Sequence, residues 1–306
     1  MVRTHVNAAG AAAVIPLLDG PVRDGAVVGA FSRAVIISVG TPEGPRVLSL
    51  LAPRAAGMPN GVRLSADDAV ALTRPVRGEA VSVGTGRILL DGLEVRVVRS
   101  WPCRARRVCV DRRSIDTIAD LAAARPSGVP AECVAALRSA LSTDESAARS
   151  APTSAPAAPA ARIPLDADDA LRAAARGLVG RGLGLTPGGD DVIAGALCGL
   201  HATGATGGVR LLAAAGLENV TERTTLLSAD LLKLAGAGDA CLEVLAVLRA
   251  AHHPRDVLRP NHSALAAAID RLLRVGHTSG ADLATGLAVG LRAGAHLGTR
   301  ERAEVG

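Results

Sequence analysis

The sequence predicts an α+β protein in which a small β-rich sandwich or partly open barrel is followed by an all-helical domain. Short runs rich in valine, isoleucine and leucine, separated by turn residues, fill residues 26–110. Residues 142–164 are mostly alanine, proline and serine and have no hydrophobic period. After them, the apolar spacing, the caps and the glycine stops are those of helices.

These observations divide the chain into three parts. Residues 1–141 form the β-rich domain and end in two helices, which we expect at 115–124 and 130–141. Residues 142–164 form a linker or a mobile surface loop. Residues 165–306 form the helical domain. Phe31 and Trp101, the large aromatic residues of the chain, fall in the β-rich part and are expected to fill its core.

Composition indicates a globular protein. The 306 residues are 49% hydrophobic and 21% charged, which is enough apolar material for a substantial core. No apolar run has the length of a membrane span, so no membrane partner is expected. The five cysteines form no CxxC pair, which favours reduced thiols and a cytoplasmic location.

The net charge is +5, and the basic side chains gather most densely in the arginine cluster of residues 104–113. Such a cluster is either an anion or nucleic-acid patch or a solvated face. Because the chain has few aromatic rings on which bases could stack, we do not expect nucleic-acid binding. The role of the cluster stays open.

Two glycine-rich turns in front of apolar helices are the candidates for a functional site. The first turn is RGLGLTPGGDD, residues 181–191, and the second turn is VGHTSGAD, residues 275–282. Both contain the pattern T-x-G-x-D, and each is followed by a glycine pair at GxxxG spacing. The pairs are Gly195 with Gly199 and Gly286 with Gly290. Such pairs let two helices approach closely, so we expect the two helices to pack together and the two turns to meet.

The first turn offers three kinds of chemistry. Thr186 starts it, and Gly188 and Gly189 leave backbone amides uncovered by side chains, which suits a phosphate or carboxylate. Asp190 and Asp191 fall in the first turn of the next helix, where acids suit the helix dipole. They could hold a divalent ion that bridges to the ligand, or one of them could orient a histidine or accept a substrate proton. The alternative is an ordinary capped helix start.

The second turn contributes the candidate catalytic histidine. His277 is the histidine that lies within such a turn, so we expect it, with Asp190 and Asp191, to act in catalysis. Thr278 and Ser279 are hydroxyl caps of the last helix, followed by Gly280 and by Asp282 one turn later; we expect all four to bind substrate, as do Thr186, Gly188 and Gly189. No metal-ligand spacing is present, so neither a metal nor a cofactor is expected.

At these residues the chain resembles a known family. GLGLTPGGDD is similar to the G-L-x-P-S-G-D-D signature of the AllH-like family, with Gly188 where serine is usual. VGHTSGADLATG resembles the second signature, RTTLLSADLLKLAGAG fits the segment between them, and AVVGAFSRAVIISV with PNGVRL is similar to the N-terminal β region. The resemblance extends over most of the chain outside the alanine and proline stretch.

The resemblance implies a subunit of a carbamoyltransferase. The family includes one subunit of the oxamate carbamoyltransferase of allantoin catabolism, which works with two unrelated subunits on oxamate and carbamoyl phosphate. Both are small anions that suit helix N-termini, and His277 could polarise the carbamoyl carbonyl. The glycine at 188 removes a hydroxyl and suggests a different substrate. The alternative is a non-catalytic metabolite-binding or assembly subunit of a purine-catabolic complex.

Overall fold

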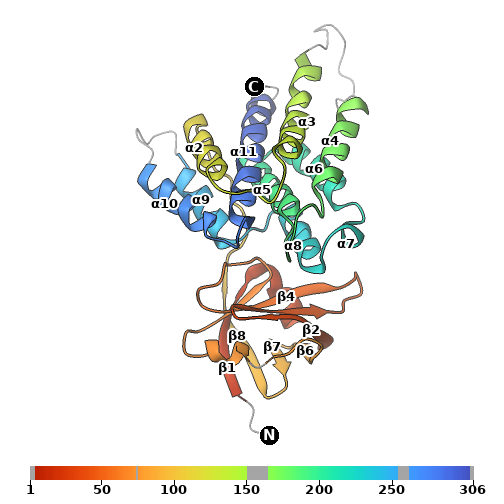
Figure 1. Cartoon of the computed structure of the whole chain (residues 1–306), viewed down its shortest axis with the longest axis vertical. Helices are drawn as coiled ribbons and strands as arrows, with labels where there is room; N and C mark the ends of the chain where they lie inside the picture. The colour runs from red at the N-terminus through yellow and green to blue at the C-terminus, as the bar shows by residue number, and fades with distance from the viewer. Residues whose placement is uncertain (1–3, 74, 150–164, 254–261, 304–306) are drawn as a thin grey trace. The chain divides into compact units, whose positions relative to one another are not determined.

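The computed structural model describes residues 4–73, 75–149, 165–253 and 262–303, and the chain forms two compact units. The first unit consists of Met1–Arg104 and Asp239–Leu245, and the second of Ala105–Gly238 and Ala246–Gly306. Strands occupy the N-terminal region and helices the C-terminal region, as predicted (Figure 1). The domain boundaries predicted at 141/142 and 164/165 stay predictions.

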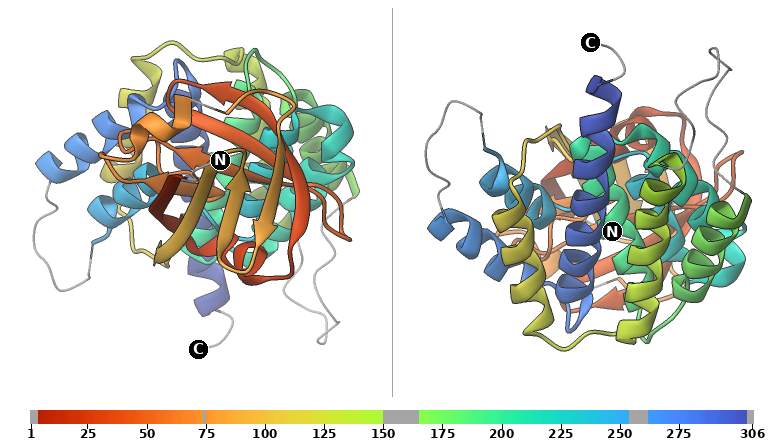
Figure 2. Two further views of the ribbon diagram at one scale, coloured as in Figure 1. Left: turned by 90° about the horizontal axis from the view of Figure 1, so that it is seen from below. Right: turned by 90° about the horizontal axis from the view of Figure 1, so that it is seen from above.

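The first unit is a closed β-barrel. Within the described residues its eight strands follow the order β1-β5-β4-β3-β2-β6-β7-β8, and β8 pairs in parallel with β1 to complete the ring (Figure 2, left). The barrel prediction is therefore confirmed, except that the barrel is closed rather than partly open. The strands are β1 (Thr4–Ala11), β2 (Arg23–Phe31), β3 (Ala34–Val39), β4 (Arg46–Leu51), β5 (Gly61–Leu64), β6 (Ala80–Gly84), β7 (Arg87–Leu90) and β8 (Leu93–Trp101). Two 3₁₀ turns, η1 (Ala12–Val14) and η2 (Ala69–Thr73), and the short helix α1 (Ile15–Asp19) join them.

The barrel interior follows the alternation of side chains along each strand. In β3, Val35, Ile37 and Val39 all point into the core cluster. Trp101 packs against this cluster, as predicted, and lies under the guanidinium of Arg63 at 5.5 Å. The core prediction for Phe31 is wrong, because its side chain at the end of β2 is 46% exposed.

A short segment from far along the chain completes the first unit. Ala240 donates its amide to the Cys103 carbonyl at 2.7 Å, and Leu242 donates to the Gly57 carbonyl at 3.0 Å. A Cβ on Gly57 would lie 2.6 Å from the Leu242 side chain, so the loop and the segment pack backbone against side chain. The loop at Gly57 and the segment 239–245 thus belong to the same compact unit, although they are far apart in the sequence.

The second unit is helical. Its helices are α2 (Arg112–Ala123), α3 (Ala131–Arg149), α4 (Leu165–Leu178), α5 (Gly188–Thr203), α6 (Thr206–Leu217), α7 (Val220–Arg223), α8 (Leu226–Gly236), α10 (His262–Leu273) and α11 (Ser279–Ala303), together with most of α9 (Leu242–Ala251). The helices expected at 115–124 and 130–141 correspond to α2 and α3. Helix α3 continues to Arg149, into the stretch expected to be a linker, and the rest of that stretch, residues 150–164, lies outside the described residues.

Helices α5 and α11 form the centre of the second unit, and their glycines make this possible. A Cβ on Gly286 would overlap the Val192 carbonyl oxygen, and a Cβ on Gly199 would lie 2.6 Å from the Leu291 amide nitrogen. Successive contacts advance along both helices in the same direction, so α5 and α11 run parallel and in backbone contact. The expected pairing of the two GxxxG helices is confirmed. Helices α2 and α3 pack on opposite sides of α11 (Figure 2, right).

Two further expectations concerned reduced cysteine thiols and the lack of a membrane-spanning segment. All five cysteines are free of disulfide bonds; Cys103 and Cys198 are buried, and Cys109 is exposed. Among the helices in the described ranges, none combines the length and the apolar character that a bilayer crossing requires.

The contact between α5 and α11 predicts a specific cost for adding a methyl group. Gly286→Ala should destabilise the protein by about 1–3 kcal/mol, because the new Cβ would force the helices apart. The matched control is Gly177→Ala in α4, whose Cβ would meet nothing within 4 Å; it should be neutral or stabilising by up to about 1 kcal/mol. Thermal unfolding of both variants measures the difference, and equal melting temperatures would contradict the proposed packing.

Candidate functional site

The two glycine-rich turns meet in the second unit. Because α5 and α11 run parallel, their N-termini lie at the same end of the helix pair. The hydroxyl oxygens of Thr186 and Ser279 are 3.1 Å apart, within hydrogen-bonding distance. We call these two groups the hydroxyl pair. Their contact confirms the expectation that the turns come together.

Asp190 holds the first turn against α8 and its preceding loop. Its Oδ1 accepts the Gly180 amide at 2.7 Å, and its Oδ2 accepts the Ser228 hydroxyl at 2.6 Å and the Thr224 hydroxyl. The residue is only 2% exposed. Both carboxyl oxygens are therefore used in fixing the local structure.

Asp282 does the same for the second turn. It accepts the Ser127 hydroxyl at 2.6 Å and the Gly128 amide at 3.0 Å, and it is fully buried. Ser127 and Gly128 lie in the loop between α2 and α3, so a third loop reaches the same end of the helix pair. A Cβ on Gly128 would lie 3.0 Å from the Thr278 hydroxyl oxygen.

Sequence reasoning missed four residues that hold these aspartates. They are Ser127, Gly128, Thr224 and Ser228. The available signals were the PSGVP turn between two expected helices and the hydroxyl-rich TTLLS that precedes a helix. Neither signal indicates which distant carboxyl group the hydroxyls will meet.

Asp191 differs from the other two aspartates. It is 7% exposed, and its side chain hydrogen-bonds with the hydroxyls of Ser279 and Thr186. Its Oδ2 is buried and has no hydrogen-bond partner among the described residues. Burial raises the pKa of Asp191 well above its ordinary value of 3.8, and the charges of Asp282 and Asp190 raise it further, against the two hydroxyl hydrogen bonds. The side chain therefore holds its proton well above the pH at which an ordinary aspartic acid ionises.

Comparison of the two T-x-G-x-D repeats distinguishes the positions that have a polar counterpart in the other repeat from those that do not. The two matched aspartates of the repeats each fix a neighbouring loop through one amide and at least one hydroxyl. Aligning the repeats places Leu283 where the first has Asp191, and Pro187 where the second has Ser279. Asp191 and Ser279 thus have no polar counterpart in the other repeat, and they are the residues that contact each other.

The glycines serve packing rather than an open amide cradle. The Gly189 amide already donates to the Arg181 carbonyl at 2.9 Å, and the Gly280 amide donates to the Val275 carbonyl at 2.9 Å. A Cβ on either glycine would overlap a carbonyl oxygen of the preceding helix. The Gly189 amide, expected to be free for an anion, is therefore paired within the chain.

Gly188 occupies a position without room for a side chain. A Cβ there would lie 2.6 Å from Oδ2 of Asp282 and 3.0 Å from the Cα of Gly128. The glycine at 188, where the family signature has serine, matches this close approach of the third loop.

His277 is exposed, at the edge of the second turn. Its side chain has no hydrogen bond or ion pair with any other residue that the structure describes. The carbonyl of Thr278 accepts the amides of Ala281 and Asp282 at 2.9 and 3.0 Å, as expected for the residue that precedes a helix. The start of α11 is thus fixed by backbone hydrogen bonds.

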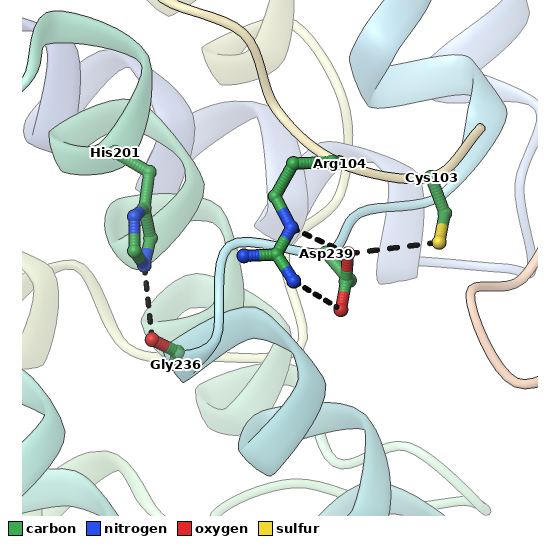
Figure 3. A network of polar contacts seen from close by, with 5 residues as sticks. All are labelled: Cys103, Arg104, His201, Gly236 and Asp239. Atoms are coloured by element: carbon green, nitrogen blue, oxygen red, sulfur yellow. Dashed lines mark hydrogen bonds and ion pairs between the residues drawn. The ribbon is translucent and has the colours of Figure 1, made fainter. Parts of the chain in front are cut away.

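Two arginines of the cluster, Arg104 and Arg107, have partners within their own compact units. In the first unit, Nε of Arg104 donates to Oδ1 of Asp239 at 3.0 Å, and the Cys103 thiol lies 3.6 Å from the same oxygen (Figure 3). Burial raises the pKa of the Cys103 thiol, so it is not an activated nucleophile. In the second unit, the Arg107 guanidinium covers Gly204 at the C-terminus of α5, where a cation suits the helix dipole.

The same helix end has a second contact within the second unit. His201 hydrogen-bonds the Gly236 carbonyl at 2.9 Å and so joins α5 to α8 (Figure 3). This contact lies at the opposite end of α5 from the two turns, and it accounts for His201 as a packing residue.

Residues 178–291 match the family model described as oxamate carbamoyltransferase subunit AllH. The match supports an AllH-like family assignment. It spans both turns and the segment between them, whereas the resemblance of the N-terminal strands to this family has no such match. No curated protein and no solved structure matched the chain.

The AllH-like segment therefore contains every residue that the sequence predicted for the site. Thr186, Ser279 and Asp191 contact one another, while Asp190 and Asp282 hold loops on either side. In the described part of the chain, no three or more histidine, cysteine, aspartate or glutamate side chains are grouped so as to hold a metal ion.

Replacing either loop-holding aspartate should destabilise the protein. Asp190→Asn or Asp282→Asn leaves an amide nitrogen facing hydrogen-bond donors, at a cost of about 1–3 kcal/mol. Asp120→Asn, at an exposed position of α2, is the matched control and should change little. Denaturant unfolding measures the free energies. Unchanged stability in both site variants would show that these hydrogen bonds do not hold the loops.

Asp191→Asn should have the opposite effect, and the effect should depend on pH. Because its folded-state pKa is raised, Asp191 costs no stability below its ordinary pKa of 3.8, and stability falls as the pH rises toward the folded-state value. The free energy of unfolding of Asp191→Asn relative to the parent, measured by denaturant unfolding, should therefore increase from about pH 4 upward, by at most roughly 1.4 kcal/mol per pH unit. Asp120→Asn should show no such trend. A difference that shrinks with rising pH would contradict the raised pKa.

Proposed function

We propose that this chain is a subunit of a carbamoyltransferase that acts on a small anion of the oxamate or carbamoyl phosphate type. The observation that carries the proposal is the family match over residues 178–291, which contains both turns that meet at the hydroxyl pair. We place the ligand at the hydroxyl pair. The printed family description also names a subunit, so we infer that the chain works with partner subunits.

The hydroxyl groups at the place where the two turns meet suit a small anion because they can donate hydrogen bonds. The hydroxyls of Thr278 and Ser279 lie at or just before the N-terminus of α11, and that of Thr186 lies just before α5; helix dipoles favour negative charge at both places. Because the pKa of Asp191 is raised, its carboxyl group stays uncharged to a higher pH than that of an ordinary aspartic acid, which lessens its repulsion of an anion. The flanking aspartates, Asp190 and Asp282, are surrounded by amide and hydroxyl donors that offset their charge.

We assign different roles to the three residues expected to act in catalysis. His277 is exposed, so a ligand can reach it, and we assign it the role of polarising a carbamoyl carbonyl or moving a proton. Asp191 lies behind the hydroxyl pair and acts through it. Asp190 positions the start of α5 through three hydrogen bonds, so we assign it a supporting role rather than contact with the ligand.

The alternative is a subunit that binds a metabolite or assembles a complex without reacting. Two observations favour it: the His277 side chain has no polar partner among the described residues, and Asp190 is used structurally, whereas a catalytic base is usually oriented by a third group. In this alternative the hydroxyl pair still binds the anion, and the bond-breaking groups belong to a partner subunit.

A reconstituted complex tests the proposal. The chain is purified with its candidate partner subunits, and consumption of carbamoyl phosphate with oxamate is measured. His277→Ala should lower kcat by about 10²–10⁴-fold if the histidine transfers a proton. His262→Ala, at the start of α10, is the matched control and should retain activity.

The outcomes separate the two functions. Full activity of His277→Ala, together with lost activity when the hydroxyl pair is removed (Thr186→Val with Ser279→Ala), would support the binding subunit. No turnover with any combination of partners would contradict the carbamoyltransferase proposal.

A further inference from the structure

The loop that precedes α5 carries an exposed apolar side chain near the hydroxyl pair. Leu183 is 97% exposed, the highest value among the large hydrophobic side chains that the structure describes, and Leu185 in the same loop is 46% exposed. Single exposed leucines are ordinary on protein surfaces. Leu183, however, lies only three residues before Thr186, so the two Cα atoms are at most about 11 Å apart. The partly exposed hydroxyl pair therefore lies within reach of this loop.

Hydrogen bonds hold the loop at its two ends. The Arg181 carbonyl accepts the Gly189 amide at 2.9 Å, and the Leu185 carbonyl accepts the Thr225 hydroxyl at 2.5 Å. Between these anchors, the backbone groups of residues 182–184 make no hydrogen bond with any other described residue. Backbone that lacks hydrogen bonds and buried side chains moves at the lowest cost in free energy.

Two glycines with positive φ flank Leu183. Gly182 has a φ of 117° and Gly184 a φ of 100°, values that residues with a side chain rarely adopt. A Cβ on Gly182 would lie 2.8 Å from the Gly188 amide nitrogen, so the loop begins against the start of α5. A Cβ on Gly184 would meet nothing within 4 Å, so packing does not hold the tip of the loop in place.

We propose that residues 182–184 form a lid that closes over the hydroxyl pair when the small anion binds, with Gly182 and Gly184 as its hinges and Leu183 as the side chain that covers the ligand. The inference rests on the proposed function for the place of the ligand. Closure removes water from the hydroxyl pair, and a hydrogen bond to an anion is stronger where water is excluded. Closure also buries a leucine that is exposed in the unliganded chain.

The exposed apolar area suits a small ligand better than a protein partner. In the described part of the second unit, the large hydrophobic side chains with high exposure are Leu183, Leu185 and Leu121, the last at 37%. A standard protein interface buries about 800 Å² on each partner and has an apolar centre. A three-residue tip with one leucine offers far less, whereas it is large enough to cover an anion of the size of oxamate.

Hydrogen exchange of the full chain tests the lid directly. Peptides that contain residues 182–185 should exchange rapidly in the unliganded protein and more slowly with saturating oxamate or carbamoyl phosphate. The turn at Gly44, between β3 and β4 of the barrel, is the control region and should exchange at the same rate with and without the anions. Exchange of the loop that neither anion slows would overturn the inference.

Leu183→Ser separates the lid from a role in folding. Because Leu183 is 97% exposed, the change should leave the melting temperature of the unliganded chain unaltered. It should weaken the binding of the anions by about tenfold to a hundredfold, because the closed lid no longer buries a leucine. Titration calorimetry measures the affinity. Val70→Ser, at a 67% exposed position of η2, is the matched control and should change neither quantity. Unchanged affinity of Leu183→Ser would contradict the lid.

Gly184→Ala tests the hinge against Gly44→Ala. Gly44 has a φ of 108°, and an added Cβ there would also meet nothing within 4 Å. Both alanines should lower the melting temperature by a similar amount, because the same backbone conformation is strained for alanine. Only Gly184→Ala should also weaken anion binding, because its Cβ restricts the rotations that close the loop. Equal affinities of these two variants would overturn the assignment of the hinge.

Three outcomes separate the lid from the proposed reaction and from a docking loop. Protection of the loop by either anion, in a complex that transfers no carbamoyl group, would support the inference and contradict the proposed reaction. An active complex in which neither anion protects the loop would overturn the inference and leave the proposed reaction standing. Lost complex assembly in Leu183→Ser, with anion binding to the chain unchanged, would identify a partner-docking surface and overturn the lid.

Discussion

The backbone contact between α5 and α11 is the interaction on which the helical unit depends. At Gly195 and Gly199 on one helix and Gly286 and Gly290 on the other, a Cβ would meet backbone atoms of the facing helix. The two parallel helices therefore approach closely at these four positions. Parallel packing brings two helix starts to one end, and so creates the site. Antiparallel packing of the same glycines would have placed the two turns at opposite ends.

Where the two helices start side by side, the positive ends of two helix dipoles lie close together, and aspartates occupy both of them. Asp190 and Asp282 each sit at a positive helix end and each bind the amide of a glycine from a neighbouring loop. Their charges, together with burial, raise the pKa of Asp191.

The prediction from sequence succeeded where a signal is local. Gly276 has a positive φ of 61° and ends a helix as predicted, and the GxxxG spacing identified the helix contact. It failed where small residues gave a weak pattern: β1, which closes the barrel, is rich in alanine and glycine and was not recognised as a strand. The exposure of Phe31 was missed because hydrophobicity alone does not tell whether a side chain at the end of a strand points into the barrel or outward.

The sequence by itself determined the helical and β-rich regions, the two turns and the residues from which the site is made. These depend on local spacing, turn chemistry and glycine content. Only the tertiary structure decided which aspartates hold neighbouring loops, because their hydrogen-bond partners lie far away in the chain. Ser127 and Gly128 meet Asp282, and Thr224 and Ser228 meet Asp190. Asp191 is distinguished by burial and by the hydroxyls that it meets, and neither can be computed from its neighbours in sequence.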